Sequence, residues 1–109
     1  MDEARFEELV ADALDSLPPE LASHMDNVAV EVQDGEPTGH LLGHYQGQPL
    51  TQRSLWYHSA PDVITIYRLP ILSRCRSEKE VARQVRSTVV HEVGHHFGID
   101  DKKLRELGW

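Results

Sequence analysis

The hydrophobic positions of the first segment recur every three or four residues, which is the spacing of one helical face. They are Phe6, Leu9, Val10, Ala13, Leu14 and Leu17. Pro18 ends this predicted helix, because proline has no amide hydrogen to donate inside a helix. Pro19 is suited to the first turn of a second, short helix.

The period then changes to that of β-strands. Apolar and polar residues alternate over 28–32, which indicates a half-buried strand. Residues 41–45 predict a second strand near an edge, because Gly43 weakens it. Residues 63–67 form the densest β-branched run and predict the most buried strand. The stretch 50–61 has no clear period and stays unassigned.

A long helix follows the strands. Ser77 and Glu80 have the spacing of a capping box, which predicts the start of the helix. The helix is expected to run to about Phe97 and to end at Gly98, because glycine tolerates the backbone conformation that terminates helices.

A last short helix is predicted to begin at Asp100 or Asp101, with Leu104 and Leu107 turned inward. The order of elements predicts an α+β fold, in which the N-terminal helix and the long helix pack on a small mixed sheet of three or four strands. No repeat or linker divides the sequence, so residues 1–109 are expected to form a single domain.

Composition argues against several classes of function. Eighteen acidic against eleven basic residues give a net charge of −7, which disfavours binding to a nucleic-acid backbone. No run approaches the ~20 apolar residues of a membrane span, and the acidic N-terminus does not resemble a signal peptide. A single cysteine excludes an intrachain disulfide. We therefore expect a cytoplasmic protein that binds neither nucleic acid nor membranes.

The candidate chemistry lies in residues 91–95, an H-E-x-x-H motif on the predicted long helix. Histidines four residues apart share one helical face, so both imidazoles can reach one ion, and Glu92 can point at a water on that ion. Gly98 can turn the chain sharply and carry the Asp101 carboxylate back to the metal. Two imidazoles, one carboxylate and an open position make a catalytic zinc site.

Chance is a poor explanation of this pattern. A chain of this composition contains H-E-x-x-H with a probability of about 0.04, and the pattern extended by glycine and aspartate with about 2 in 10,000. The two histidines also lie away from the main apolar face of the helix.

Neighbouring residues have competing interpretations. Asp101 can cap the last helix instead of binding metal, and Asp100 is the alternative for either role. His96 lies ~100° from His95, inside the apolar arc, which favours a place in the core or beside the ligands over ligation. Two arginines flank Cys75 and favour a lowered thiol pKa, but no catalytic motif surrounds it.

The roles of two further groups of residues, the remaining histidines and the tyrosines, stay open. His44 lies on the candidate edge strand, and the other scattered histidines are expected to be structural or solvated. The tyrosines are most simply core or rim residues, and one of them can donate to an oxyanion. They are Tyr45, Tyr57 and Tyr67.

The extended motif His91-Glu92-x-x-His95-x-x-Gly98-x-x-Asp101 resembles the zincin metallopeptidases, in the group with an aspartate where metzincins carry a third histidine. Further segments are similar to the small bacterial zincin-like "minimal metallopeptidase" family, so the resemblance covers most of the chain. These segments are 43–47, 49–51, 88–90 and 104–108.

This resemblance implies a zincin-like fold with Zn²⁺ on His91, His95 and Asp101 and with Glu92 as the general base. It also implies an edge strand that holds an extended peptide substrate. Metzincins place a methionine turn downstream of the motif, whereas both methionines of this chain precede it. The floor of the site is therefore expected from other residues.

The leading functional hypothesis is a zinc-dependent peptidase, in which Glu92 takes a proton from the attacking water. One alternative is a zinc- or peptide-binding module with little or no turnover. Another is a structural or regulatory protein that uses its acidic surface to bind a basic partner. The glutamate favours the peptidase, because zinc binding alone does not require it.

Overall fold

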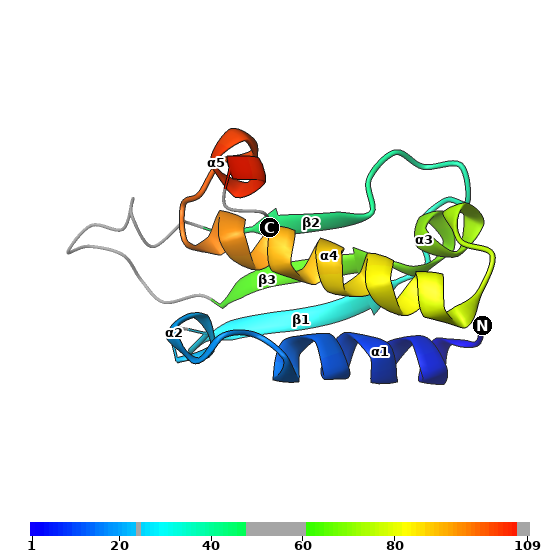
Figure 1. Cartoon of the computed structure of the whole chain (residues 1–109), viewed down its shortest axis with the longest axis horizontal. Helices are drawn as coiled ribbons and strands as arrows, with labels where there is room; N and C mark the ends of the chain where they lie inside the picture. Colours follow the sequence, from blue (N-terminus) through cyan, green and yellow to red (C-terminus); the bar gives the residue numbers. More distant parts are fainter. Residues whose placement is uncertain (24, 48–60, 107–109) are drawn as a thin grey trace.

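The computed structural model describes residues 1–23, 25–47 and 61–106. The predicted α+β order is confirmed, with the elements shown in Figure 1. They are α1 (Glu3–Asp15), α2 (Pro19–Ala22), β1 (Val28–Gln33), β2 (Gly43–Gln46), β3 (Asp62–Tyr67), α3 (Arg68–Arg74), α4 (Glu78–His96) and α5 (Asp101–Glu106). Nearly all of the unassigned stretch 50–61, and Leu107, lie outside the described residues.

The sheet is mixed and three-stranded in the described part of the chain. β3 lies in the centre, with β1 parallel on one side and β2 antiparallel on the other. Its β-branched run is buried as predicted, with Ile64 and Ile66 both 0% exposed. The second strand begins at Gly43 rather than at Leu41, which is 61% exposed.

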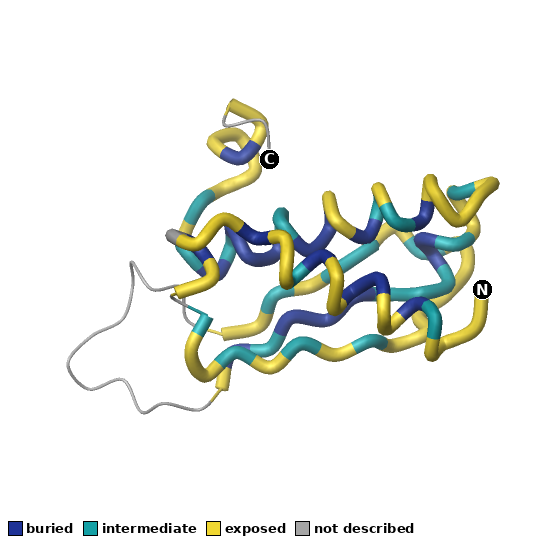
Figure 2. The backbone as a smooth tube through the Cα atoms, turned by 60° about the horizontal axis from the view of Figure 1, so that its bottom comes forward, coloured by how far each residue is buried: buried dark blue, intermediate teal, exposed yellow. Residues whose placement is uncertain are grey.

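The helices cover the sheet and enclose the core. α4 packs against β2 and β3, and α1 packs alongside α4 (Figure 1). Buried positions recur along both helices, as their hydrophobic periods predict (Figure 2). Among the described helices, none is both long and apolar enough to span a bilayer.

The predicted helix start at Ser77 is confirmed. Its side chain accepts a hydrogen bond from the backbone N–H of Glu80 at 3.1 Å, which satisfies one amide of the first turn. The Glu80 carboxylate reaches the backbone N–H of Arg76, one residue before the cap, at 2.6 Å. In the second hydrogen bond of the capping box, the glutamate therefore accepts from the residue before the N-cap instead of from the N-cap itself.

The sequence pattern does not predict α3, which follows β3 without a loop. Pro70 is its third residue, where a backbone N–H has no acceptor within the helix, so proline is tolerated there. Pro70 and Ile71 are buried, and α3 packs against α4. Tertiary burial therefore stabilises a helix that local sequence signals do not reveal.

Candidate functional site

The end of α4 and the turn after it position the three predicted metal ligands. His91 and His95 lie one helical turn apart on α4. Gly98 has a φ of 80°, as the predicted turn requires. The backbone N–H of Gly98 donates to the carbonyl of His95 at 2.9 Å, and that of Ile99 to the carbonyl of Gly94 at 3.0 Å. These two bonds form a Schellman motif, which turns the chain toward α5.

The turn brings the Asp101 carboxylate to both imidazoles. Its Oδ1 lies 2.9 Å from Nε2 of His91 and 2.9 Å from Nε2 of His95. Tetrahedral zinc with bonds of ~2.0–2.1 Å separates neighbouring ligand atoms by about 3.3 Å. The carboxylate oxygen therefore lies slightly closer to each nitrogen than one zinc ligand lies to another, and a small outward movement of Asp101 would bring both distances to that value.

The same contacts shift the charge state of Asp101. The hydrogen bond with His95 holds the pKa of the Asp101 carboxyl below its usual value. Desolvation opposes this shift, and the charges of His91 and His95 add to it. An ionised carboxylate is the form that binds a metal ion.

Asp100 and Asp101 divide the two roles that the sequence leaves open. Asp100 caps α5, because its Oδ1 accepts a hydrogen bond from the backbone N–H of Lys103 at 2.8 Å. Asp101 is the first residue of α5, and its side chain turns to the histidines instead. Capping therefore does not compete with a ligand role for Asp101.

Glu92 lies buried between the histidines, with 5% of its surface exposed. Its Oε1 is 3.1 Å from Nδ1 of His95, whereas the Asp101 carboxylate faces Nε2 of the same ring. If Nδ1–H donates to this oxygen when a metal is bound, it would fix the tautomer that leaves the Nε2 lone pair for the metal. Oε2 of Glu92 is buried and has no hydrogen-bond partner among the described residues.

Glu92 is also close enough to be considered as a ligand. Ligand atoms of His91, Glu92 and His95 lie within 4.8 Å of one another. However, Glu92 contacts the nitrogen of His95 that points away from Asp101. Asp101 and Glu92 therefore contact different nitrogens of His95, and of the two only Asp101 contacts an Nε2 atom of both histidines in the described structure.

These residues line a cavity of 380 Å³ between α4, α5 and the start of β2. The segment before β2 contributes His40, Leu41 and Leu42 to its wall. At Gly43 the backbone of β2 lies directly against α4, since a Cβ there would be 3.0 Å from Cγ of Glu92. The edge strand thus runs beside the proposed base, while the exposed His44 does not line the cavity.

His96 faces the opposite way, into the core. It is 0% exposed, and its Nδ1 lies 2.8 Å from Oδ2 of Asp62, which is 1% exposed. The hydroxyl of Tyr45 donates to the same oxygen at 2.7 Å. One carboxylate therefore connects β2, β3 and the end of α4 next to His95. The expected core position of His96 is confirmed.

The sequence pattern does not identify Asp62 as the buried partner of His96 and Tyr45. The available signal is His96 itself, because a histidine in an apolar helical arc needs a buried hydrogen-bond partner. The sequence does not show which carboxylate supplies it.

The lowered thiol pKa considered for Cys75 is not found, which leaves Cys75 as an ordinary cysteine before a helix. Burial raises the pKa of the Cys75 thiol, and the negative charge of Glu80 raises it further. The flanking Arg74 and Arg76 do not reverse this, so the thiol is less reactive than the sequence indicates.

Comparison with known proteins identifies the family. The model of a family described as zincin-like metallopeptidase matches residues 20–109, which include the whole site. Among solved structures, a conserved hypothetical protein from T. thermophilus is 22% identical, with a TM-score of 0.60 over 98% of this chain and 97% of that chain, and shares the fold. No curated protein matches. The chain belongs to the zincin-like metallopeptidase family.

Proposed function

We propose that the protein is a zinc-dependent peptidase, with His91, His95 and Asp101 as the metal ligands and Glu92 as the general base. The observation that carries this proposal is the buried Oε2 of Glu92, which has no partner among the described residues. Glu92 clusters with His91 and His95, whose Nε2 atoms both lie 2.9 Å from one oxygen of Asp101. A general base needs a carboxylate oxygen that can accept a proton, whereas zinc binding alone does not require this glutamate.

The donor set fits zinc. Two imidazole nitrogens and one carboxylate oxygen leave a fourth tetrahedral position open, as in catalytic zinc sites. When bound, zinc would supply a Lewis acid that polarises the scissile carbonyl and acidifies a water molecule.

The two oxygens of Glu92 would have separate tasks. Oε1 lies 3.1 Å from Nδ1 of His95 and would keep that ring oriented by accepting a hydrogen bond from it. Oε2 would accept a proton from the attacking water and deliver it to the leaving amine. Its burial keeps bulk water from competing for the proton.

The substrate would be an extended peptide along β2. No strand pairs with the outer edge of β2 in the described part of the chain. Because Gly43 lies against Glu92, a peptide that adds to this edge passes beside the cavity. Main-chain hydrogen bonds would hold it in register.

The test compares wild type with Glu92→Gln. Glutamine keeps an oxygen that can accept from Nδ1 of His95, but it cannot take a proton. We expect both proteins to bind one zinc with similar affinity by isothermal titration, and only wild type to cleave a mixed peptide library. Glu92→Leu serves as the comparison that also removes the hydrogen bond, and it should weaken zinc about tenfold or more.

Each outcome discriminates between the hypotheses. Zinc binding without cleavage by wild type would indicate a zinc- or peptide-binding module. Cleavage by Glu92→Gln at the wild-type rate would exclude Glu92 as the base. Absence of zinc binding by wild type would exclude the zinc-dependent peptidase and a zinc-binding module.

A further inference from the structure

The hydrophobic core is open on the side of β1. Val30 and Val32 pair in register with Ile64 and Ile66 of β3. The two isoleucines are 0% exposed, whereas the two valines are only half-buried. Since α1 packs alongside α4, part of the helix-facing surface of β1 stays accessible to solvent.

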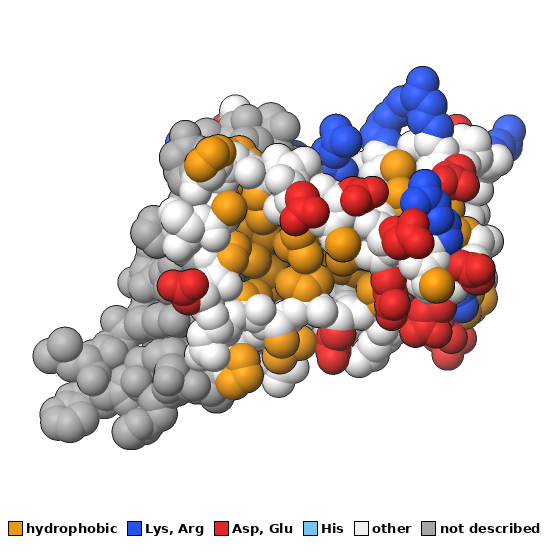
Figure 3. Space-filling view, turned by 90° about the horizontal axis from the view of Figure 1, so that it is seen from below, with side chains coloured by type: hydrophobic (Ala, Val, Ile, Leu, Met, Phe, Trp, Pro, Cys, Tyr) orange, Lys and Arg blue, Asp and Glu red, His pale blue; other side chains and the backbone are white. Residues whose placement is uncertain are grey.

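A groove of 420 Å³ occupies this opening, between α1 and β1. The lining residues are apolar except for two glutamates, and none of the described residues that line the groove is basic. The lining residues are Glu7, Val10, Ala11, Leu14, Val30, Glu31 and Val32. Figure 3 shows hydrophobic side chains gathered in a hollow on this face, with acidic side chains around it.

The groove runs beside a strand edge. No strand pairs with the outer side of β1 in the part of the chain that the structure describes. Such an edge presents N–H and C=O groups to an incoming strand. The Glu31 carboxylate lies on the other face of the sheet, where Thr65 donates to it at 3.3 Å. The edge therefore offers an apolar surface on one face and a carboxylate on the other.

We propose that β1 and this groove bind an extended segment of a partner protein in which apolar and basic residues alternate. The apolar side chains would pack on Val30, Val32 and Leu14. The basic side chains would face Glu31 on the opposite side of the new strand pair, because cross-strand neighbours of opposite charge stabilise pairing. Glu7 adds a second negative charge at the wall of the groove.

Charge argues for such a partner over a second copy of this chain. The chain has a net charge of −7, and α1 carries several exposed carboxylates, of which that of Glu7 belongs to a residue lining the groove. Pairing of β1 with its own copy would bring Glu31 and α1 close to the same acidic groups, and like charges across strands are destabilising.

The binding test uses a fluorescently labelled peptide of sequence Lys-Val-Lys-Val-Lys-Val-Lys. Two controls keep length: Glu-Val-Glu-Val-Glu-Val-Glu, and a block peptide with four lysines followed by three valines. By fluorescence anisotropy, we expect the alternating basic peptide to bind wild type at least tenfold more tightly than either control. Equal affinity for the basic and block peptides would overturn the strand-addition proposal.

Two variants locate the site. Ala11→Lys places a bulky cation in the groove at an exposed helical position, whereas Ala22→Lys makes the same change on α2. Ala11→Lys should weaken peptide binding at least tenfold, and Ala22→Lys should not change it, with both folds checked by circular dichroism. Unchanged binding in Ala11→Lys would overturn the assignment. A wild-type dimer in sedimentation that Ala11→Lys dissociates would assign the groove to a second copy instead.

Discussion

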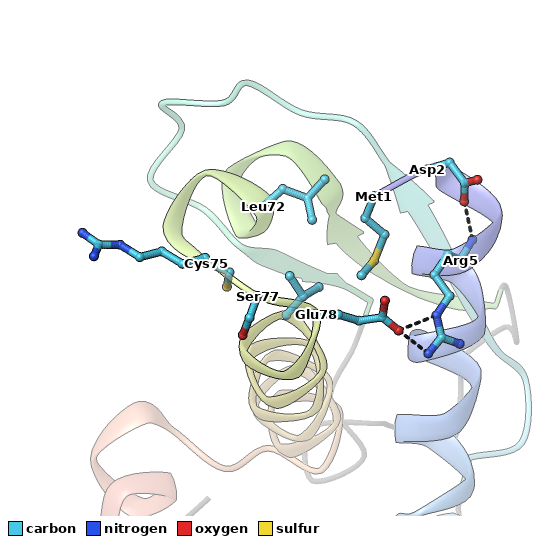
Figure 4. A pocket seen from close by; sticks show the side chains of 9 residues that line it. Met1, Asp2, Arg5, Leu72, Cys75, Ser77 and Glu78 are labelled. Atoms are coloured by element: carbon cyan, nitrogen blue, oxygen red, sulfur yellow. Dashed lines mark hydrogen bonds and ion pairs between the residues drawn. The ribbon is translucent and has the colours of Figure 1, made fainter.

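The two ends of α4 each border a cavity, and they differ in what the polar groups do. The cavity at the N-terminal end has a volume of 510 Å³, against 380 Å³ at the C-terminal end. In the larger one, the side chain of Arg5 donates to Glu78 at 2.8 Å, and the backbone N–H of Arg5 donates to Asp2 (Figure 4). Arg5 also donates to Glu8 at 2.8 Å. Asp2, Arg5 and Glu78 are thus occupied with one another.

In the smaller cavity, the polar groups are incompletely paired. Nε2 atoms of two histidines converge on one carboxylate oxygen, and Oε2 of Glu92 is buried without a partner among the described residues. Burying an unpaired polar atom costs free energy, so Oε2 is expected to find its partner in a water molecule or a ligand in the cavity. The comparison shows that convergent, incompletely paired groups mark the candidate site better than cavity size does.

The largest expected effect is on zinc affinity. His95→Ala removes one of three ligands and should weaken zinc about a thousandfold, or about 4 kcal/mol. Glu78→Ala, at the other end of α4, should leave the affinity unchanged. Competition with a chromophoric chelator measures the zinc affinity of both variants. A similar loss of affinity in the two would contradict a zinc site confined to the C-terminal end of α4.

The second effect contrasts a buried carboxylate with an exposed one. Asp62→Ala leaves His96 and Tyr45 without their shared acceptor, and should lower the free energy of unfolding by about 3 kcal/mol. Glu78→Ala breaks an exposed ion pair and should change it by less than about 1 kcal/mol. Thermal unfolding measures both, and equal losses would contradict the assigned role of Asp62.

The third effect separates the adjacent aspartates. Asp101→Asn should weaken zinc roughly ten- to a hundredfold, because the amide is a poorer ligand than the carboxylate. Asp100→Asn retains a side chain that can cap α5, so its zinc affinity should stay within about twofold. The reverse order of the two affinities would assign the metal to Asp100.

The smallest effect tests the turn. Gly98→Ala should lower stability by about 1 kcal/mol, because its φ of 80° disfavours any side chain. Gly98→Val is strained further and should also displace Asp101 and weaken zinc. Circular dichroism with zinc titration separates the two effects, and wild-type zinc affinity in Gly98→Val would remove the proposed reason for glycine.

Local signals in the sequence predict most of α4 and of the ligand geometry. The helical period, the Ser77 cap and the Gly98 turn act within a few residues, so the convergence of His91, His95 and Asp101 follows from short-range rules. These rules also place His96 in the core. The peptidase activity inferred from them stays a prediction.

Such local rules do not predict contacts between residues that are far apart in the sequence. Asp62 and His96 meet only because β3 and α4 pack together, and nothing near Asp62 in the sequence marks that contact. The parallel pairing of β1 with β3 and the helix α3 likewise depend on tertiary burial. The thiol pKa of Cys75 is set by burial and Glu80 and not by its two neighbouring arginines.

A crystal structure of the protein with zinc bound tests the central claim most directly. We expect one ion with Nε2 of His91, Nε2 of His95 and an oxygen of Asp101 at ~2.0–2.2 Å, and with Glu92 outside the ligand set, facing the fourth position. Zinc held by Glu92 with Asp101 turned away, or zinc bound elsewhere on the molecule, would contradict it.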